Sequence, residues 1–276
     1  MAIDSGADIE AVCNEAATMA AERLETEVRD MRALKVSEPD IEAKTSRTIT
    51  LEDFDEAIDV VQMGEARVSR AHAMSREDML QTAYHEVGHA AVMIARGGDP
   101  VTKITIVPRA RALGYTQALP DGDRFNMTEE QLKTRIMMTM GGRVAQEVFL
   151  KTVDTGASND FKQASSMARR MITEFGMSEL GPIHVDDSAV QMAGGFYGPE
   201  LLNSINKEWR RILTESKEEA RRIIEENRPR IERVVLVLME KETILGPEFR
   251  QLWNGSADAY AVVPQAVSDT TDGAIS

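Results

Sequence analysis

Residues 80–95, LQTAYHEVGHAAVMIA, place two histidines and a glutamate within a helical apolar pattern. The imidazoles of His85 and His89 are four positions apart, so on a helix of 3.6 residues per turn they lie on one face and can reach one metal ion. Glu86 lies about 100° further round the helix, where its carboxylate can take a proton from a water on that ion. This order of residues predicts a zinc site for peptide-bond hydrolysis.

The surrounding sequence predicts that this motif lies in the middle of a helix. Ser75-x-x-Asp78 is typical of a capping box at a helix start, and Gly97-Gly98 provides a stop. The alternative is a pair of structural histidines on the polar side of an amphipathic helix. With four histidines in 276 residues, such a pairing by accident is rare, which favours the metal site.

Zinc needs a third protein ligand, and three residues are candidates. His72 lies in a segment without a helical pattern, and His184 lies in a turn flanked by Gly and Pro. Asp160 is the better candidate, because it follows a turn of small residues and opens a predicted helix. An aspartate in a first helical turn is also commonly a cap or a partner of the helix dipole, and position alone leaves that alternative open.

Four sequence blocks occur in order along the chain: AYHEVGH at 83–89, LGYTQ at 113–117, MGGRVA at 140–145 and TGASND at 155–160. Together they resemble the peptidase domain of FtsH-type AAA zinc metalloproteases. The resemblance implies that His85, His89 and Asp160 bind one Zn²⁺ per chain and that Glu86 is the catalytic carboxylate. Glu147, which follows the Gly-Gly-Arg block, is the second choice for the third ligand.

The resemblance extends over roughly residues 4 to 250 and implies a domain organisation. Residues 1–70 are similar to the C-terminal helical part, the lid, of an AAA ATPase module, and residues 71–250 to the zinc metallopeptidase domain. Residues 251–276 are rich in Gly, Ser, Ala, Asp and Thr and are expected to be a disordered tail. The expected fold is mainly α, a small helical lid segment followed by a helical peptidase domain with a small β-sheet.

Periodicity predicts where the main elements lie. Helices are expected from residue 6 to about 33, after Thr50-x-x-Asp53, after Thr128-x-x-Gln131, and on either side of Asn227 between residues 199 and 241. Residues 238–245 are similar to the closing helices of the family. Within the helix after Thr128, Gly141-Gly142 is better explained by close helix packing than by ligand binding. The single cysteine, Cys13, excludes an intrachain disulfide and is expected to be in the core.

Two alternating segments, 101–107 and 114–119, carry the only substantial strand signal. A peptide substrate must lie extended across the metal, and an exposed sheet edge can hold it by backbone hydrogen bonds. Gly114, Tyr115 and Thr116 are therefore expected to bind substrate. The alternative, an internal hairpin of the fold, is about equally compatible with the sequence.

Several functions are disfavoured by what the sequence lacks. No Gly-x-x-x-x-Gly-Lys-Ser/Thr loop occurs, so ATP is expected to act only through an ATPase module missing from this chain. The net charge of -14 disfavours nucleic-acid binding. The longest apolar runs are about six residues, against 18 or more for a membrane span, so the chain as given is expected to be soluble. It is expected to be a C-terminal fragment or a naturally truncated form.

The expected function is zinc-dependent endopeptidase activity on unfolded or membrane-extracted proteins. The resemblance implies a homo-hexamer coupled to an ATPase ring, with a membrane-anchored full-length form whose peptidase lies on the cytoplasmic or equivalent organellar side. Two alternatives remain open. The chain could be an oligomerisation and interaction platform of a protease complex, or a latent peptidase that needs an ATPase to deliver substrate.

Overall fold

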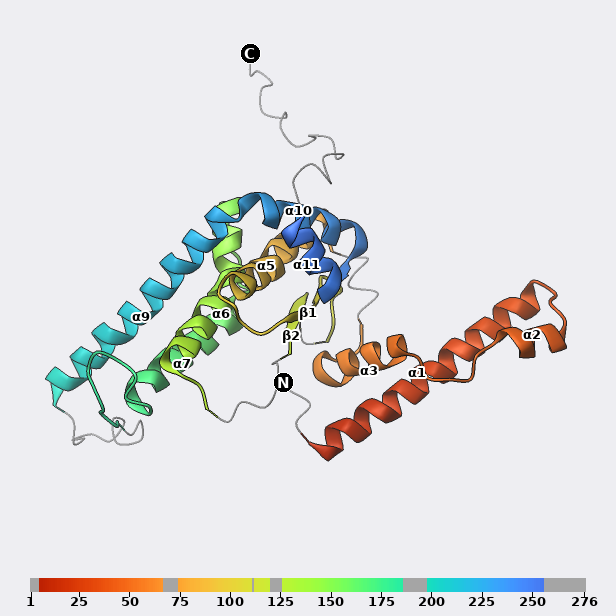
Figure 1. The fold of residues 1–276 in the computed structure, drawn as a ribbon, viewed down its shortest axis with the longest axis horizontal. Helices are drawn as coiled ribbons and strands as arrows, with labels where there is room; N and C mark the ends of the chain where they lie inside the picture. Colours follow the sequence, from red (N-terminus) through yellow and green to blue (C-terminus); the bar gives the residue numbers. More distant parts are fainter. Residues whose placement is uncertain (1–4, 67–73, 111, 120–125, 186–197, 256–276) are drawn as a thin grey trace, which may run out of the picture. The chain divides into compact units, whose positions relative to one another are not determined.

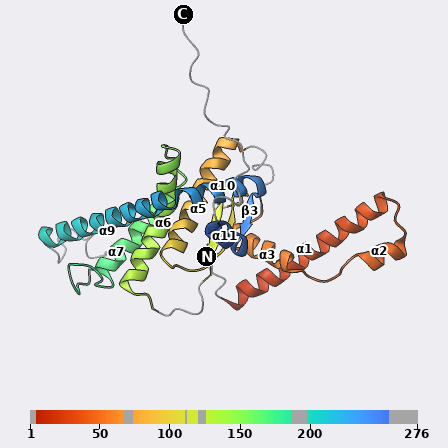
Figure 2. The same ribbon diagram turned by 45° about the horizontal axis from the view of Figure 1, so that its top comes forward.

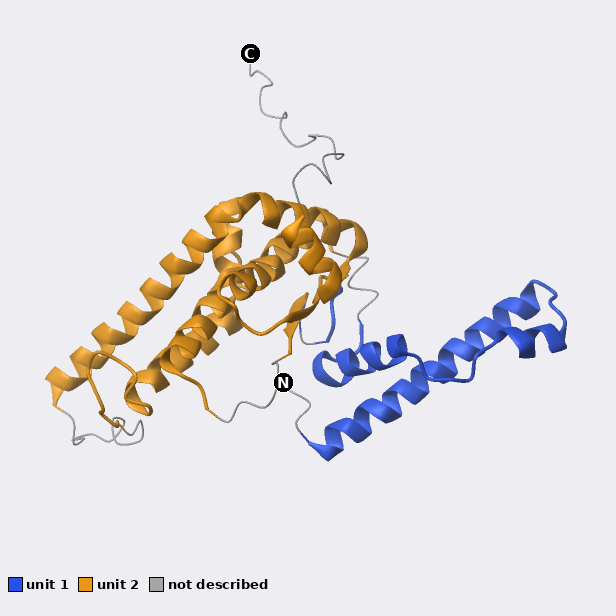
Figure 3. Ribbon diagram, viewed as in Figure 1, with its two compact units in different colours: residues 1–73, 107–113 blue, residues 74–106, 114–276 orange. Residues whose placement is uncertain are grey.

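The computed structural model describes residues 5–66, 74–110, 112–119, 126–185 and 198–255. These residues form helices and one small antiparallel sheet, which confirms the predicted mainly α fold (Figure 1). The chain divides into two compact units (Figure 3), unit 1 with residues 1–73 and 107–113 and unit 2 with residues 74–106 and 114–276.

Unit 1 is built from three helices, α1 (Gly6–Ala33), α2 (Glu38–Lys44) and α3 (Leu51–Met63). The predicted capping box of Thr50 and Asp53 begins α3. Helix α2 was not predicted, because Pro39 breaks the pattern of α1; in the first turn of α2 its missing N–H costs no hydrogen bond. Small apolar side chains join α1 to α3. Cys13 is exposed, so its predicted place in the core is wrong.

Residues 107–113 belong to unit 1 although they follow a strand of unit 2 in the chain. Arg109 is 5% exposed, and its Nη2 lies 2.7 Å from Glu56 Oε2 and 3.0 Å from Asp59 Oδ2 of α3. A buried guanidinium requires such partners, since an unpaired charge away from water is costly. The predicted boundary near residue 70 did not include this segment, whose place depends on contacts distant in sequence.

Unit 2 contains α5 (Arg76–Ala95), α6 (Glu129–Phe149), α7 (Ser158–Thr173), α9 (Pro199–Glu226), α10 (Arg228–Lys241) and α11 (Gly246–Asn254). The capping boxes predicted before α5 and α6 are confirmed. Helices α6, α7 and α9 pack side by side (Figure 2), and their apolar faces share one core around Ile136, Met171 and Ile212. A second core joins α5 to the sheet and to α10 and α11.

The sheet of unit 2 has the order β2-β1-β3, with β1 (Val101–Thr105), β2 (Tyr115–Ala118) and β3 (Thr243–Leu245). Both pairings are antiparallel, and Ile104 of the central strand lies opposite Thr116 and Ile244. Residues 238–245 were expected to be helical, but α10 ends at Lys241, so the prediction is wrong for the last residues of this range. Glu242 adopts a left-handed conformation with φ 59° and stops α10, after which the chain joins the sheet.

Helices α5 and α6 cross with their backbones in close contact at Gly88 and Gly141. A Cβ atom on Gly88 would lie 2.5 Å from the Gly141 carbonyl oxygen, and one on Gly141 would lie 2.6 Å from the Gly88 carbonyl oxygen. No larger residue fits at either position without moving the helices apart. The predicted packing role is therefore confirmed for Gly141, whereas a Cβ atom on Gly142 would meet the rings of His85 and His89 and not the backbone of α5.

The C-terminal end of the described chain is helical. Helix α11 continues to Asn254 and buries Leu252 and Trp253, which lie within the expected tail of residues 251–276. Residues 256–276 of that tail lie outside the described residues. Among the helices that the structure describes, none combines the length and apolar character needed to cross a membrane.

Candidate metal centre

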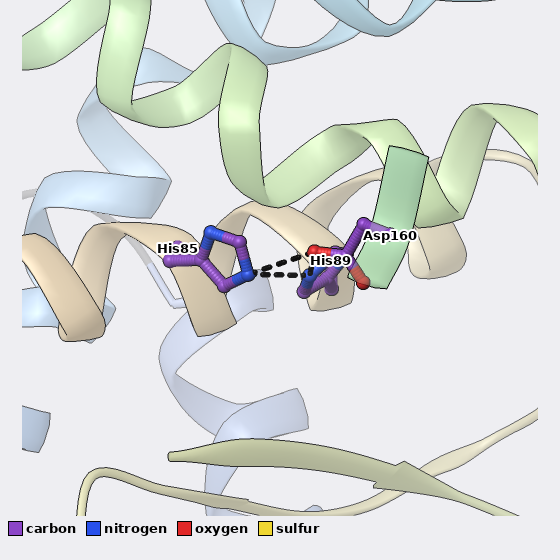
Figure 4. A group of neighbouring side chains, drawn as sticks. All are labelled: His85, His89 and Asp160. Carbon is purple, nitrogen blue, oxygen red and sulfur yellow. Dashed lines mark hydrogen bonds and ion pairs between the residues drawn. The ribbon is translucent and has the colours of Figure 1, made fainter. Parts of the chain in front are cut away.

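Three side chains from two helices converge on one point, His85 and His89 from α5 and Asp160 from the first turn of α7 (Figure 4). The two Nε2 atoms are 3.1 Å apart. Asp160 Oδ2 lies 3.1 Å from His85 Nε2 and 3.5 Å from His89 Nε2. In the part of the chain that the structure describes, these residues form the one group of three that could hold a metal ion.

The spacing of these atoms fits a tetrahedral zinc ion. With bonds of about 2.0–2.1 Å to nitrogen and oxygen, two ligand atoms of a tetrahedron are about 3.3 Å apart. The three observed separations of 3.1, 3.1 and 3.5 Å lie close to that value. Two imidazoles and one carboxylate suit zinc chemically, and three protein ligands leave a fourth position for water or substrate.

Neighbouring residues fix the histidines in place. His89 Nδ1 lies 2.7 Å from the Met138 carbonyl oxygen of α6, so Nδ1–H donates to that oxygen, and once the ring is neutral the lone pair of Nε2 faces the centre. A Cβ atom on Gly142 would lie 2.6 Å from His89 Nε2 and 2.7 Å from the His85 ring. Glycine at position 142 thus leaves room for both rings against α6.

In the protein without metal, burial and neighbouring charges shift the pKa values of His89 and Asp160. Burial opposes the charged form of His89, but the carboxylates of Asp160 and Glu86 outweigh it and raise the pKa of His89 to about 9. Burial also opposes ionisation of Asp160, yet hydrogen bonds from His85 and His89 hold the pKa of that carboxyl well below its usual range. The carboxylate is therefore ionised and ready to act as a ligand.

The alternative role for Asp160 was that of a helix cap. The N-cap of α7 is Ala157, which supplies no side-chain cap, and the Asp160 carboxylate contacts the imidazoles. Asp160 still lies in the first turn of α7, where the helix dipole stabilises its negative charge. The local and the metal-binding roles are thus compatible in one side chain.

Glu86 is 6% exposed and lies next to strand β2. Thr116 Oγ1 of β2 is 2.9 Å from Glu86 Oε2 and 2.8 Å from the Glu86 carbonyl oxygen. A Cβ atom on Gly114 would lie 3.1 Å from Glu86 Cγ and 2.7 Å from the Thr105 carbonyl oxygen, so the chain enters β2 directly against this side chain. The structure therefore brings the predicted substrate strand to the predicted catalytic carboxylate.

The turn that leads to Asp160 is held by a residue that sequence reasoning missed. Gln146 of α6 is 2% exposed, and its Nε2 donates to Asp154 Oδ2 at 2.9 Å. Asp154 Oδ1 in turn accepts the Gly156 backbone N–H at 2.7 Å. The sequence carried one signal, a polar residue in the apolar pattern of a buried helix face, but not its partner.

The other candidates for the third ligand lie apart from the centre. Glu147 binds three cations, with Arg143, Lys217 and Arg221 at 3.0, 3.0 and 2.6 Å. His184 is exposed and belongs to no ligand group among the described residues. His72 lies outside the described residues.

A cavity of about 440 Å³ lies elsewhere in unit 2 and contains none of the metal-group residues. Two of its three arginines pair with carboxylates, since Arg222 bonds Glu219 and Glu226 and Arg96 bonds Glu130. Cavity size alone would favour this place as a ligand site. Within the described residues, the titratable groups with metal-ligand geometry lie at the His85 centre, which is the stronger candidate.

Comparison with known proteins agrees with the centre. Peptidase family M41 matches residues 72–252. The chain is 40% identical over 261 residues to "ATP-dependent zinc metalloprotease FtsH 4" of Sorangium cellulosum, covering 91% of this chain and 37% of that protein. It is 36% identical over 260 residues to "ATP-dependent zinc metalloprotease FtsH 1" of a Thermoanaerobacter species, covering 91% and 39%. The chain thus spans less than half the length of these relatives, and it belongs to peptidase family M41.

Proposed function

We propose that this chain is a zinc-dependent endopeptidase that hydrolyses peptide bonds of unfolded or membrane-extracted proteins. The observation that carries the proposal is the convergence of His85, His89 and Asp160 at tetrahedral spacing, on the helix that also carries Glu86. Relatives with matching sequence are zinc metalloproteases by name.

The chemistry divides between the metal and the chain. A zinc ion held by His85, His89 and Asp160 supplies a Lewis acid that polarises the scissile carbonyl and lowers the pKa of a water. Glu86 is the general base and acid: one carboxylate oxygen takes the proton from the attacking water and delivers it to the leaving amine. Its burial at 6% exposure keeps that proton transfer away from bulk solvent.

Substrate binding is assigned to β2. Within the described residues this strand is at the edge of the sheet, paired with β1 on one side. An extended peptide can add to such an edge through backbone hydrogen bonds, which need no particular sequence. Gly114, Tyr115 and Thr116 are the proposed contacts, because this part of the strand lies against Glu86.

The remaining features of the proposal concern the longer protein. Residues 1–70 are assigned to the lid of an AAA ATPase module, residues 71–250 to the peptidase and residues 251–276 to a tail. Names of the relatives include ATP dependence, and the chain covers 37% and 39% of their lengths. We therefore assign ATP-driven delivery of substrate, a homo-hexamer and a membrane anchor with the peptidase on the cytoplasmic or equivalent side to the full-length form.

The test combines metal content with cleavage of an unfolded, casein-like polypeptide, in the absence of ATP. We expect one zinc per chain in both the wild type and Glu86→Gln. Cleavage should fall by at least about 100-fold in the variant, because general acid–base groups contribute about 10²–10⁴-fold. Glu77→Gln, on the same helix, is the matched control and should cleave like the wild type.

Each other outcome has a defined meaning. Absence of zinc in the wild type would contradict the proposal at its root, and cleavage by Glu86→Gln would remove Glu86 from the mechanism. Zinc without cleavage in the wild type would instead support a latent peptidase or an oligomerisation platform.

A further inference from the structure

Thr116 has a side-chain position that substrate binding through the backbone does not explain. Its hydroxyl is half-buried and lies within hydrogen-bond distance of two oxygens of one residue, the carbonyl and Oε2 of Glu86, at 2.8 and 2.9 Å. Among the side chains that the structure describes, Thr116 is the one that hydrogen-bonds the Glu86 carboxylate.

The chemistry of a hydroxyl limits what this contact can do. Thr116 has one proton to donate, and both neighbouring oxygens are acceptors, so it serves one of them at a time. The helical carbonyl of Glu86 already lies in the hydrogen-bond ladder of α5, whereas the buried carboxylate needs a donor to offset its loss of water. Oε2 is therefore the acceptor that gains most from the hydroxyl, and Oε1 is left available for a reacting group.

The sheet fixes the place of this hydroxyl. Thr116 pairs with Ile104 of the central strand β1, and Ile104 is fully buried and also pairs with Ile244 of β3. Two residues earlier, Gly114 brings the backbone against Glu86 Cγ. The hydroxyl is thus held by strand register rather than by a mobile loop.

We propose that Thr116 is a positioning residue, which holds the Glu86 carboxylate through Oε2 so that Oε1 faces the reacting water. This inference rests on the proposed function, in which Glu86 is the base. It also gives β2 two tasks: the backbone receives the substrate, and one side chain orients the group that acts on it. Seating of substrate and orientation of the base then depend on the same rigid strand.

The test compares Thr116→Val, which loses the hydroxyl at nearly constant shape, with Thr116→Ser, which keeps it. Thr102→Val is the matched control, since the Thr102 hydroxyl lies on the neighbouring strand and contacts Gln117. In the zinc-loaded chain, kcat for a fluorogenic peptide should fall about tenfold in Thr116→Val, the rate equivalent of one lost hydrogen bond. KM and zinc content should stay within about twofold, and Thr116→Ser and Thr102→Val should behave like the wild type.

A second readout needs no turnover. A peptide hydroxamate binds zinc and can donate a hydrogen bond to the neighbouring carboxylate, whereas a peptide thiol binds through sulfur alone. Calorimetry should find about fivefold weaker hydroxamate binding in Thr116→Val and unchanged thiol binding, as expected for one misaligned hydrogen bond. This comparison decides the proposal even if the chain is latent.

Three results would overturn the positioning role. The first is unchanged kcat and hydroxamate affinity in Thr116→Val. The second is a change confined to KM, which would make the Thr116 side chain, and not only its backbone, a substrate contact. The third is a Thr116→Ser variant as impaired as Thr116→Val, which would point to packing of the methyl group. Failure of the proposed function has a different signature, because a wild type without zinc would bind neither inhibitor.

Discussion

Asp160 and Glu147 are carboxylates of similar burial in unit 2, but their neighbours differ in kind. Asp160 meets two imidazoles, at 3.1 and 3.5 Å, while Glu147 meets Arg143, Lys217 and Arg221. An imidazole can lose its proton near neutral pH and become a metal ligand, whereas a guanidinium or an ammonium stays charged. The Asp160 region can therefore release protons and bind a metal ion, whereas the charge of Glu147 stays balanced by its three cationic neighbours.

The comparison of Asp160 with Glu147 also shows that a lowered carboxyl pKa does not by itself identify a metal ligand. Burial raises the pKa of both carboxyls, and it is outweighed in Asp160 by the two histidines and in Glu147 by Lys217 and Arg143. The net direction is the same in both, a lowered pKa. The identity of the neighbours, and not the direction of the shift, therefore distinguishes a ligand from a structural ion pair.

The largest expected effect is on zinc affinity and comes from removing the charge of each carboxylate in turn. Asp160→Asn should weaken zinc binding by more than about 100-fold, because loss of an outer partner alone costs about 10–100-fold. Glu147→Gln makes the same chemical change in the other region and should leave zinc affinity within about threefold. Competition with a chelator measures both. Full zinc affinity in Asp160→Asn together with loss in Glu147→Gln would reverse the assignment.

The second prediction concerns pH. Because the pKa of His89 is raised to about 9 in the metal-free protein, His89 carries a proton at pH 7 that zinc must displace. Zinc affinity should therefore rise by up to about tenfold per pH unit between pH 7 and 9 and level off above that. Chelator competition at several pH values, corrected for the chelator's own protonation, measures the slope. A flat profile would mean that His89 is already neutral at pH 7.

A smaller effect is expected from the turn that precedes Asp160. Gln146→Leu removes the donor to Asp154 and should weaken zinc binding about tenfold, as expected for loss of an outer partner. Gln163→Leu, at an exposed position of α7, is the control and should bind zinc normally. Helical content from circular dichroism should stay unchanged in both variants. Normal zinc affinity in Gln146→Leu would show that the turn keeps its place without this hydrogen bond.

The smallest expected effect is on the free energy of unfolding and concerns the structural role of Glu147. Glu147→Gln leaves three cations close together and should lower the free energy of unfolding by about 1–2 kcal/mol. The exposed pair of Glu174 with Arg170 is the matched control, and Glu174→Gln should cost less than about 0.5 kcal/mol. Urea unfolding measures both. Equal costs would mean that the Glu147 cluster is no more than a surface ion pair.

Much of this fold could be predicted because its signals are local. The capping residues Ser75, Thr50 and Thr128 begin the helices predicted from them, and each depends only on the next three positions. The short strand β3 was missed because it has only three residues, and its Ile244 and Leu245 can be taken for a continuation of the apolar pattern of α10. The left-handed Glu242 that ends this helix is not a glycine, so the sequence gives no stop signal there.

The candidate site divides in the same way. The spacing of His85, Glu86 and His89 can be recognised in the sequence, since one helix sets their geometry. The contact of Thr116 with Glu86 spans 30 positions, and that of Gln146 with Asp154 depends on the fold of a turn. Such contacts are decided by the packing of elements, which periodicity alone does not contain.

The burial of Arg109 bears on how a separate peptidase could be prepared. A chain begun at residue 74 would retain Arg109 but lose Glu56 and Asp59, two carboxylates that form ion pairs with it. The segment 107–113, which connects β1 to β2, would then keep a cation that has lost these two ion pairs, shortly before the proposed substrate strand. Expression from residue 74 therefore calls for a redesigned 107–113 connection. Unit 1 is formed by two separate segments, residues 1–73 and 107–113, and truncation before residue 74 removes only the first of them.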